Sequence, residues 1–165
     1  MKRRFFIFSL IFVFAVNFSF ADFGVGGEQG FDVKALYKPY SREFLNVSFR
    51  FDENPWCLSA NVWIFGGIFD AKADNWFVNE PLSKTVSWYG FWGVNARVGF
   101  EKPMLATGGR LGAGIDWFLL DRRELEIFWQ GAWSPYLGAE KDDDWQFMIR
   151  PLCFEIASGV RWWFR

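Results

Sequence analysis

Charged side chains within otherwise apolar, alternating segments are the residues of this sequence that could do chemistry. They are Arg50, Arg97, Arg110, Asp116, Glu126, Glu155 and Arg161. A carboxylate can act as a general acid or base. Charges of both signs in one narrow interior would instead pair, because an unpaired buried charge is strongly destabilising. We expect a buried charge network, with catalysis by Asp116, Glu126 or Glu155 as the alternative.

Several classes of enzyme are excluded by residue types that the sequence lacks. The chain has no His, which removes Ser-His and Cys-His nucleophilic systems and His-based metal sites. It also has no glycine-rich phosphate-binding loop and no Cys-rich metal pattern. The net charge is −1, and no basic run indicates a nucleic-acid partner. We therefore expect no catalytic, cofactor-binding or metal-binding site.

The first residues have the features of a secretory signal peptide. Residues 2–4 are basic, residues 5–16 are mainly apolar, and Ser19 and Ala21 are small. This order of segments is typical of an exported protein that is cleaved after the last small residue. An uncleaved membrane anchor is the alternative, but the apolar run is short and gives way to polar residues. We predict a signal peptide at 1–21.

The rest of the chain, residues 22–165, alternates between apolar and polar residues in segment after segment. Between residues 43 and 52, for example, Leu45, Val47 and Phe49 alternate with Asn46, Ser48 and Arg50. A period of two residues is that of a β-strand, whose successive side chains point to opposite faces. Clusters of turn-forming residues separate these segments. The pattern predicts a single all-β domain.

We predict eight strands from this alternation. Six are clear, at 43–52, 57–69, 85–101, 104–119, 123–137 and 151–164. Two more are expected at 22–28 and 31–38, split by a turn at Glu28-Gln29-Gly30, while 70–84 and 138–144 are predicted to be polar connections. An alternative assignment uses 145–150 as a strand instead. Eight strands suit the smallest membrane barrels, and an even number keeps both chain ends on one side.

After residue 22 no apolar stretch is long enough for a spanning helix, so a protein that enters lipid must do so as a closed barrel. Three features indicate that the apolar faces of such a barrel point outward, into a membrane. The polar faces carry charges of both signs together with many small residues, which suits a narrow lumen. Most strands have the length of a tilted crossing. Aromatic residues near strand ends resemble the belts at membrane interfaces; they are Trp56, Trp88, Tyr89, Trp117, Trp133, Tyr136 and Trp162. We predict an antiparallel up-and-down transmembrane β-barrel with a lumen charge network, in which Arg97 and Arg110 pair with acids.

The two cysteines, Cys57 and Cys153, stand on the polar side of their segments. An exported protein could form a disulfide between them. In the predicted strand order, however, they lie on the fourth and eighth strands, on opposite sides of the barrel. That position would place their Cα atoms too far apart for a bridge. We favour two unbridged cysteines.

The last strand carries a recognisable pattern of polar, Gly, any, any, aromatic, any, aromatic, which is Ser158-Gly159-Val160-Arg161-Trp162-Trp163-Phe164. It resembles the terminal-strand signal that bacterial outer-membrane β-barrel proteins present to their assembly machinery. Arg165 departs from that family, which usually ends on the aromatic residue. The resemblance implies an assembly signal at Ser158, Gly159, Trp162 and Phe164. It also implies outer-membrane lipid and the barrel-assembly machinery as partners. By alternation, Trp162 and Phe164 should face lipid and Trp163 the lumen.

These inferences predict an integral outer-membrane barrel with a structural or surface-interaction role. One alternative is a narrow channel or a conduit for small apolar molecules, because Trp63, Phe65, Phe91, Phe118 and Phe128 stand on the lumen side. Another is a soluble periplasmic ligand-binding β-barrel, whose apolar faces would point inward. The sequence identifies neither a solute nor a surface partner.

Overall fold

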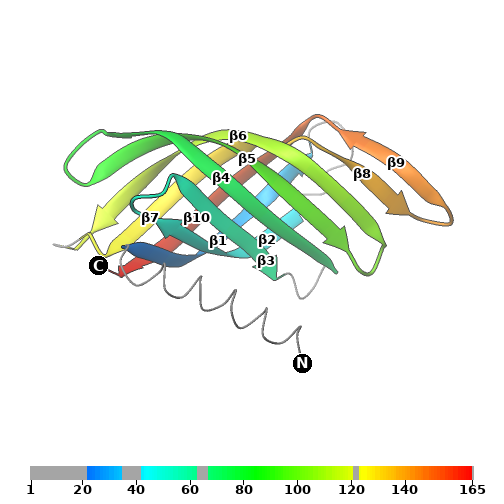
Figure 1. Ribbon diagram of the computed structural model, residues 1–165, viewed down its shortest axis with the longest axis horizontal. Coiled ribbons are helices and arrows are strands. Elements are labelled where there is room, and N and C mark those ends of the chain that lie inside the picture. Colours follow the sequence, from blue (N-terminus) through cyan, green and yellow to red (C-terminus); the bar gives the residue numbers. More distant parts are fainter. Residues whose placement is uncertain (1–21, 35–41, 63–66, 121–122, 165) are drawn as a thin grey trace, which may run out of the picture.

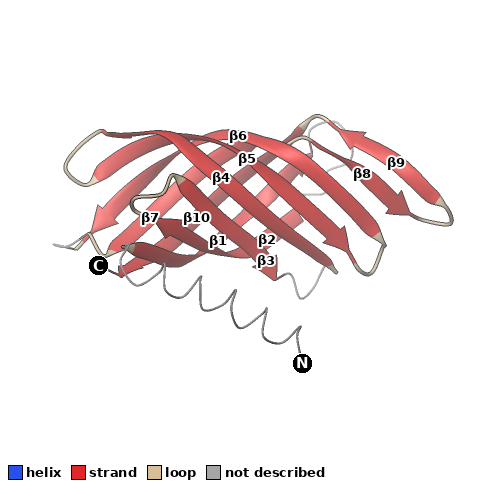
Figure 2. Cartoon of the chain, viewed as in Figure 1, coloured by secondary structure: helices blue, strands red, loops and turns tan. Residues whose placement is uncertain are grey.

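The computed structural model describes residues 22–34, 42–62, 67–120 and 123–164. Every regular element in this part of the chain is a strand (Figure 2). The strands are β1 (Phe23–Lys34), β2 (Arg42–Phe51), β3 (Trp56–Val62), β4 (Ile68–Pro81), β5 (Val86–Gly99), β6 (Met104–Leu119), β7 (Leu125–Trp133), β8 (Tyr136–Lys141), β9 (Trp145–Arg150) and β10 (Cys153–Phe164). The described residues include no helix long and apolar enough to cross a membrane.

The strands close into one antiparallel barrel (Figure 1). Neighbours follow the chain from β1 to β7, β7 pairs with β10, and β10 pairs with β1. The short strand β8 pairs with β6 beyond the end of β7, and β9 pairs with β8. Because β7 and β8 share one position in the wall, and β9 and β10 another, the barrel has eight strand positions. The predicted fold class, an eight-stranded antiparallel barrel, is confirmed.

Two prolines interrupt the long strands at these shared positions. Pro135 separates β7 from β8, and Pro151 separates β9 from β10. Proline has no backbone N–H to donate to a ladder, so it breaks the regular pairing. Other groups close the joint: the Ser134 N–H donates to the Cys153 carbonyl at 2.8 Å, and the Trp133 indole donates to the Pro151 carbonyl at 2.7 Å. The chain therefore bends here without leaving the wall.

The described chain ends lie at one end of the barrel, together with three turns. The Asp52 N–H donates to the Asp22 carbonyl at 3.0 Å, and the Trp163 N–H to the Glu124 carbonyl at 2.7 Å. The β4–β5 turn at 82–85 lies at the same end, which we call the terminal end. At the opposite, distal end the β8–β9 hairpin projects beyond the β5–β6 turn (Figure 1).

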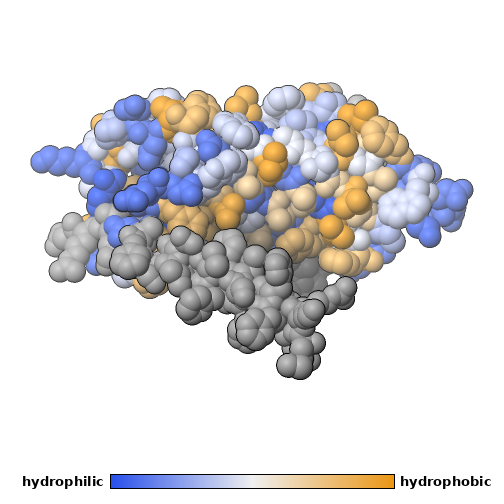
Figure 3. Space-filling model, in the orientation of Figure 1, coloured by the Kyte–Doolittle hydropathy of each residue, from blue (hydrophilic) through white to orange (hydrophobic). Residues whose placement is uncertain are grey.

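The side chains of the barrel are arranged with polar groups inside and apolar groups outside. Along β2, for example, Leu45, Val47 and Phe49 are 41–63% exposed, whereas Asn46 and Ser48 are at most 1% exposed. Figure 3 shows the result on one face, with hydrophobic side chains over the strands and hydrophilic ones at both ends. The core is therefore the barrel lumen.

Glycines on the inner face of β6 make room for aromatic rings from β5. A Cβ on Gly114 would lie 2.4 Å from the Tyr89 ring, and one on Gly112 would lie 2.5 Å from the Phe91 ring. Both rings are completely buried. The glycines therefore allow two large side chains to fill a narrow lumen.

The predicted split of residues 22–38 into two strands is wrong, because β1 runs without a break from Phe23 to Lys34. The sequence suggested a turn at Glu28-Gln29-Gly30, where glycines accumulate. In the structure Gly26 and Gly30 face inward in extended backbone, and a Cβ at either would lie within 2.3 Å of a carbonyl oxygen of β10. Close strand packing, rather than a turn, accounts for these glycines.

The predicted strand 57–69 and the predicted polar connection 70–84 are also wrong. The segment contains β3 and β4, and β4 occupies most of the supposed connection. Its polar residues Asp70, Lys72 and Asp74 point into the lumen, while small Ala71 and Ala73 face outward. The outward alanines left the apolar signal weak. The predicted connection 138–144 is likewise largely β8, and the alternative strand at 145–150 is β9.

Candidate functional site

The lumen charge network begins near the terminal end, with a cluster around Glu126 that we call the terminal cluster. The Glu126 carboxylate accepts hydrogen bonds from Arg161 and from the Trp163 indole, the latter at 2.6 Å. Arg50 lies 3.4 Å from Glu126 and 3.3 Å from Asp116. All five residues are buried. Two carboxylates and two guanidinium groups therefore balance each other here.

A stack of flat groups lies beside the terminal cluster. The Trp76 and Tyr89 rings are parallel within 8°, with centroids 3.5 Å apart. The Arg50 guanidinium carbon lies 3.7 Å from the Trp76 ring centre, an attractive cation–π distance. The Tyr89 hydroxyl donates to Gln130 at 3.2 Å. This stack fills the lumen beside the terminal cluster with closely packed flat groups.

The central cluster joins β1, β4, β6 and β10. Arg110 donates to Asp74 at 2.8 Å and to Glu155 at 2.7 Å. The Lys72 ammonium also binds Glu155, and it lies 3.6 Å from Glu28. Each of these side chains is at most 8% exposed. Four wall positions are thereby linked by charge across the lumen.

The distal cluster centres on Arg97. Its guanidinium contacts Asp32 at 3.0 Å and Asp70 at 2.9 Å. The Tyr136 ring lies 5.0 Å from the guanidinium carbon. Nearby, the Asn95 amide donates to the Ser134 hydroxyl at 2.8 Å. Three clusters therefore follow one another along the lumen from the terminal to the distal end.

The structure places all seven charged residues singled out from the sequence inside the lumen, each at most 8% exposed. Six of them pair among themselves in the terminal and central clusters. Arg97 does not, because its acids are Asp32 and Asp70. Sequence reasoning missed five further members of the network, which are Glu28, Asp32, Asp70, Lys72 and Asp74. For three of them a signal was available, because charged and small residues alternate with a period of two across residues 70–74.

The chemistry of this network is that of paired charges. Each of its carboxylates contacts a cation, and the members are closed off from solvent. A general acid or base needs access to a substrate proton, which this burial does not provide. In the described part of the chain no group of three or more His, Cys, Asp or Glu side chains is placed to hold a metal ion.

The lumen aromatics pack beneath the charged groups. Phe91, Phe118 and Phe128 are at most 5% exposed. The Arg161 guanidinium carbon lies 4.4 Å from the Phe128 ring centre, and that of Arg123 lies 4.1 Å from Phe118. Trp63 and Phe65 lie outside the described residues. The described rings therefore contribute to a filled interior.

Two aromatic residues assigned to interfacial belts from the sequence point inward instead. Tyr89 is completely buried, and Tyr136 is 6% exposed. Tyr89 comes one position after outward Trp88, so alternation itself places it on the inner face, and Tyr136 directly follows Pro135 at the joint between β7 and β8. Trp88, Trp117, Trp133 and Trp162 do face outward, with exposures of 39–45%.

The cysteines do not form a disulfide. Cys57 lies on β3 and Cys153 on β10, with β2 and β1 between them in the wall, so their strands are three positions apart and not directly opposite as predicted. Both are buried, as alternation predicted, and the Arg161 guanidinium lies 3.6 Å from the Cys57 sulfur.

The closing strand β10 pairs with β1 along its whole length, from Cys153 opposite Lys34 to Phe164 opposite Phe23. Trp162 and Phe164 face outward with exposures of 45% and 51%, whereas Trp163 is 1% exposed. Gly159 faces inward, where a Cβ would lie 2.4 Å from the Phe128 ring. Ser158 faces outward at the middle of the strand. The segment therefore has one face toward the surroundings and one in the lumen.

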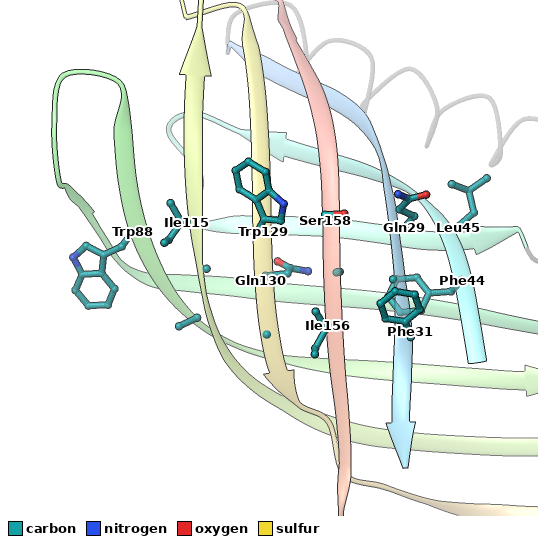
Figure 4. A pocket seen from close by; sticks show the side chains of 15 residues that line it. Gln29, Phe31, Phe44, Leu45, Trp88, Ile115, Trp129, Gln130, Ile156 and Ser158 are labelled. Atoms are coloured by element: carbon teal, nitrogen blue, oxygen red, sulfur yellow. The ribbon is translucent and has the colours of Figure 1, made fainter. Parts of the chain in front are cut away.

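A depression on the outer wall has a volume of about 980 Å³ (Figure 4). It extends over β2, β1, β10, β7, β6 and β5. Its lining includes the outward side chains of Phe31, Leu45, Trp88, Ile115, Trp129 and Ile156, together with Gln29 and Ser158. Among the described residues that line it, none is charged.

Comparisons with known proteins find similarity in structure but not in sequence family. No protein-family model matches the chain, and no curated protein matches it. Among solved structures, the chain is similar to Ail, the attachment invasion locus protein of Yersinia pestis, with 14% sequence identity and a TM-score of 0.43. The match covers 87% of this chain and 97% of that one. At this level of similarity the assignment of a closed barrel depends on the strand pairings of this chain itself.

Proposed function

We propose that this protein is an integral outer-membrane β-barrel with a filled lumen and a structural or surface-interaction role. The observation that carries the proposal is the distribution of polarity: charged groups are inside and large apolar groups are outside. Water-soluble barrels have the opposite distribution, because their apolar side chains are buried from water.

The outer surface supports this location. Large apolar side chains that are 39–63% exposed project from neighbouring strands, as Leu45, Trp88, Trp129 and Ile156 do. Monomeric proteins in water rarely expose apolar surface that continues across many elements. Lipid, by contrast, is a favourable environment for such a surface, and the paired backbone of a closed barrel satisfies its polar groups there.

The interior supports a filled barrel over a channel. Twelve charged side chains are buried in the lumen, and they are bonded in the three clusters described above. Aromatic rings pack against the charged groups, as Trp76 does against Arg50 and Phe91 against Arg110. A conduit for apolar molecules would need an apolar path, which the clusters interrupt. A soluble ligand-binding barrel would need an apolar cavity inside.

Export and assembly complete the proposal. The segment 1–21 would direct export and be removed, and the closing strand would then be read by the barrel-assembly machinery through Ser158, Gly159, Trp162 and Phe164. An unpaired strand with aromatic residues along one face can add to an exposed sheet edge by β-augmentation. Both chain ends would face the periplasm, as in bacterial barrels with an even number of strands.

The distal end supports a role at the cell surface. The β8–β9 hairpin projects from that end (Figure 1). Its outward side chains Trp145, Phe147 and Ile149 are 57–71% exposed, and its tip carries the acidic residues Asp142, Asp143 and Asp144. An exposed aromatic face beside a charged tip is suited to contact with another molecule.

Fractionation of cells that express the protein tests the proposal. The folded protein should appear in the outer-membrane pool and should migrate differently on gels before and after heating. Recovery in the soluble periplasmic pool would contradict it. Single-channel recording in planar bilayers separates the remaining alternative, since a filled barrel should give no stable conductance and a narrow channel should give one.

A further inference from the structure

The seam between β1 and β10 carries two neighbouring polar side chains on the outer wall. Gln29 and Ser158 are directly opposite each other across the two strands. Gln29 is exposed and Ser158 half-buried. Both point outward, because their neighbours Glu28 and Ala157 are buried in the lumen. An amide and a hydroxyl thus stand on a surface that is otherwise apolar in this region.

The surroundings of this polar pair are apolar on both sides. Register places Trp88, Ile115, Trp129, Ser158, Gln29 and Leu45 in one continuous row across six strands. Figure 4 shows the last five of them following one another across the wall. The polar pair is therefore flanked by Trp129 on one side and Leu45 on the other, and both are more than 45% exposed.

The pair also lies at the middle of the wall. Gln29 is near the centre of β1 and Ser158 near the centre of β10, and these two strands pair along their whole lengths. In a barrel that crosses a membrane, this position corresponds to the hydrocarbon region, where lipid supplies no polar groups. Within the described chain, neither side chain makes a hydrogen bond to another residue. An unsatisfied amide is costly in such surroundings.

The wall around the pair is hollowed. The depression of about 980 Å³ includes Gln29 and Ser158, and a second depression of about 370 Å³ shares both residues and continues past Gly27. A Cβ on Gly27 or on Gly131 would meet no atom within 4 Å. Side chains that project from a partner would therefore fit into the depressions beside the polar pair.

We propose that this face, centred on Gln29 and Ser158, binds a second copy of the chain within the membrane. The inference rests on the proposed membrane location. A glutamine amide has both donors and acceptors, so two copies related by a two-fold axis can satisfy each other's Gln29 reciprocally. The uncharged lining allows the two faces to approach without like-charge repulsion. Close packing and polar contacts of this kind drive association in lipid, where the hydrophobic effect does not.

Cysteine cross-linking in bilayers tests the proposal. The variant Gln29→Cys, made with Cys57→Ser and Cys153→Ser, should form a covalent dimer on oxidation. The matched control is Val94→Cys in the same background, because Val94 is outward, 51% exposed and located on β5, across the barrel from the seam. It should remain monomeric. Equal cross-linking at both positions, or none at Gln29→Cys, would overturn the proposal.

A second measurement uses the protein without new cysteines. Sedimentation equilibrium in density-matched micelles should detect a monomer–dimer equilibrium for the unaltered chain. The substitution Gln29→Leu should weaken the dimer by about threefold to thirtyfold, the range of polar contacts between membrane segments. A purely monomeric protein, or a dimer unaffected by Gln29→Leu, would contradict the inference.

Failure of this inference can be distinguished from failure of the proposed function. Each variant is first tested for heat-dependent gel migration and for recovery in the membrane pool. Folded, membrane-embedded barrels that remain monomeric would overturn only the dimer, and lipid would then fill the depression. Recovery of the unaltered protein in the soluble pool would overturn the proposed function itself.

Discussion

The Trp163 indole donates a hydrogen bond to the Glu126 carboxylate at 2.6 Å. This contact joins the closing strand to the lumen charge network and anchors one of three consecutive aromatic residues inside the barrel. Its neighbours Trp162 and Phe164 face outward. This short segment therefore has one ring in the lumen and two on the outer surface, and the two sets can be substituted separately.

Replacing Trp163 should destabilise the barrel more than replacing Trp162. The change Trp163→Phe removes a hydrogen bond to a charged group and should lower the free energy of unfolding by about 1.5–3 kcal/mol. Trp162→Phe keeps an outward ring and should alter it by about 0.5 kcal/mol or less. Denaturant titration of both folded variants in the same lipid provides the measurement. Equal losses would show that the indole bond contributes little.

Neutralising Glu126 should be strongly destabilising, because Arg161 and Arg50 both contact it. Glu126→Gln removes a negative charge beside two buried guanidinium groups, and it should lower the free energy of unfolding by about 3–5 kcal/mol. Glu53→Gln, in an exposed turn, is the matched control and should change the unfolding free energy by about 0.5 kcal/mol or less. A loss of similar size in both variants would argue against a paired lumen network.

Adding one methyl group should distinguish the inner and outer faces of β6. Gly114→Ala places a Cβ 2.4 Å from the Tyr89 ring, and overpacking of this kind costs about 1–3 kcal/mol. Gly109→Ala meets no atom within 4 Å and should be neutral or slightly stabilising. The two free energies of unfolding, measured side by side, check the facing of the strand. Destabilisation by Gly109→Ala alone would contradict it.

The assembly signal should be sensitive to polarity at Trp162 and Phe164. Changing both to Ser should leave export intact but reduce the amount of folded barrel in outer-membrane fractions. The control is Ile115→Ser with Trp117→Ser on β6, which likewise replaces two large outward apolar residues by Ser but lies outside the signal. Heat-dependent gel migration reports the folded fraction. If the two double variants assembled equally well, the closing strand would not be the feature that is recognised.

The two thiols should be inaccessible in the folded barrel. Cys57 and Cys153 are at most 9% exposed and unbridged, so a maleimide reagent should label neither until the protein is denatured. After denaturation without reductant, both should react. Labelling of the folded protein at either position would show that the lumen opens to solvent. Failure to label the denatured, unreduced protein would indicate a disulfide.

Alternation in the sequence was sufficient to predict the barrel and the facing of most side chains. A strand sends successive residues to opposite faces, so the polar positions of β2, β5, β6, β7 and β10 identify the lumen without knowledge of the tertiary structure. The inward position of Trp163 between two outward rings follows from the same geometry. Composition alone also excluded catalytic and metal sites that need a His, because the chain has none.

Strand boundaries were predicted poorly where neighbouring strands, and not local preference, decide the conformation. The glycines of β1 suggested a turn, although their role is close packing against β10. The outward alanines of β4 weakened its apolar signal, so Asp70, Lys72 and Asp74 were assigned to a connection. Both errors arise because the conformation of a residue in a barrel depends on the neighbouring strands, which the local sequence does not identify.

The pairing of the charges was decided by tertiary structure alone. Arg50 and Asp116 are 66 positions apart in the chain but 3.3 Å apart across the lumen. Alternation specifies that both point inward, but it does not specify their height along the barrel axis. That height depends on the register and tilt of every strand between them, which closure of the ring sets jointly. The sequence therefore determined which residues face the lumen, and the closed barrel determined which of them meet.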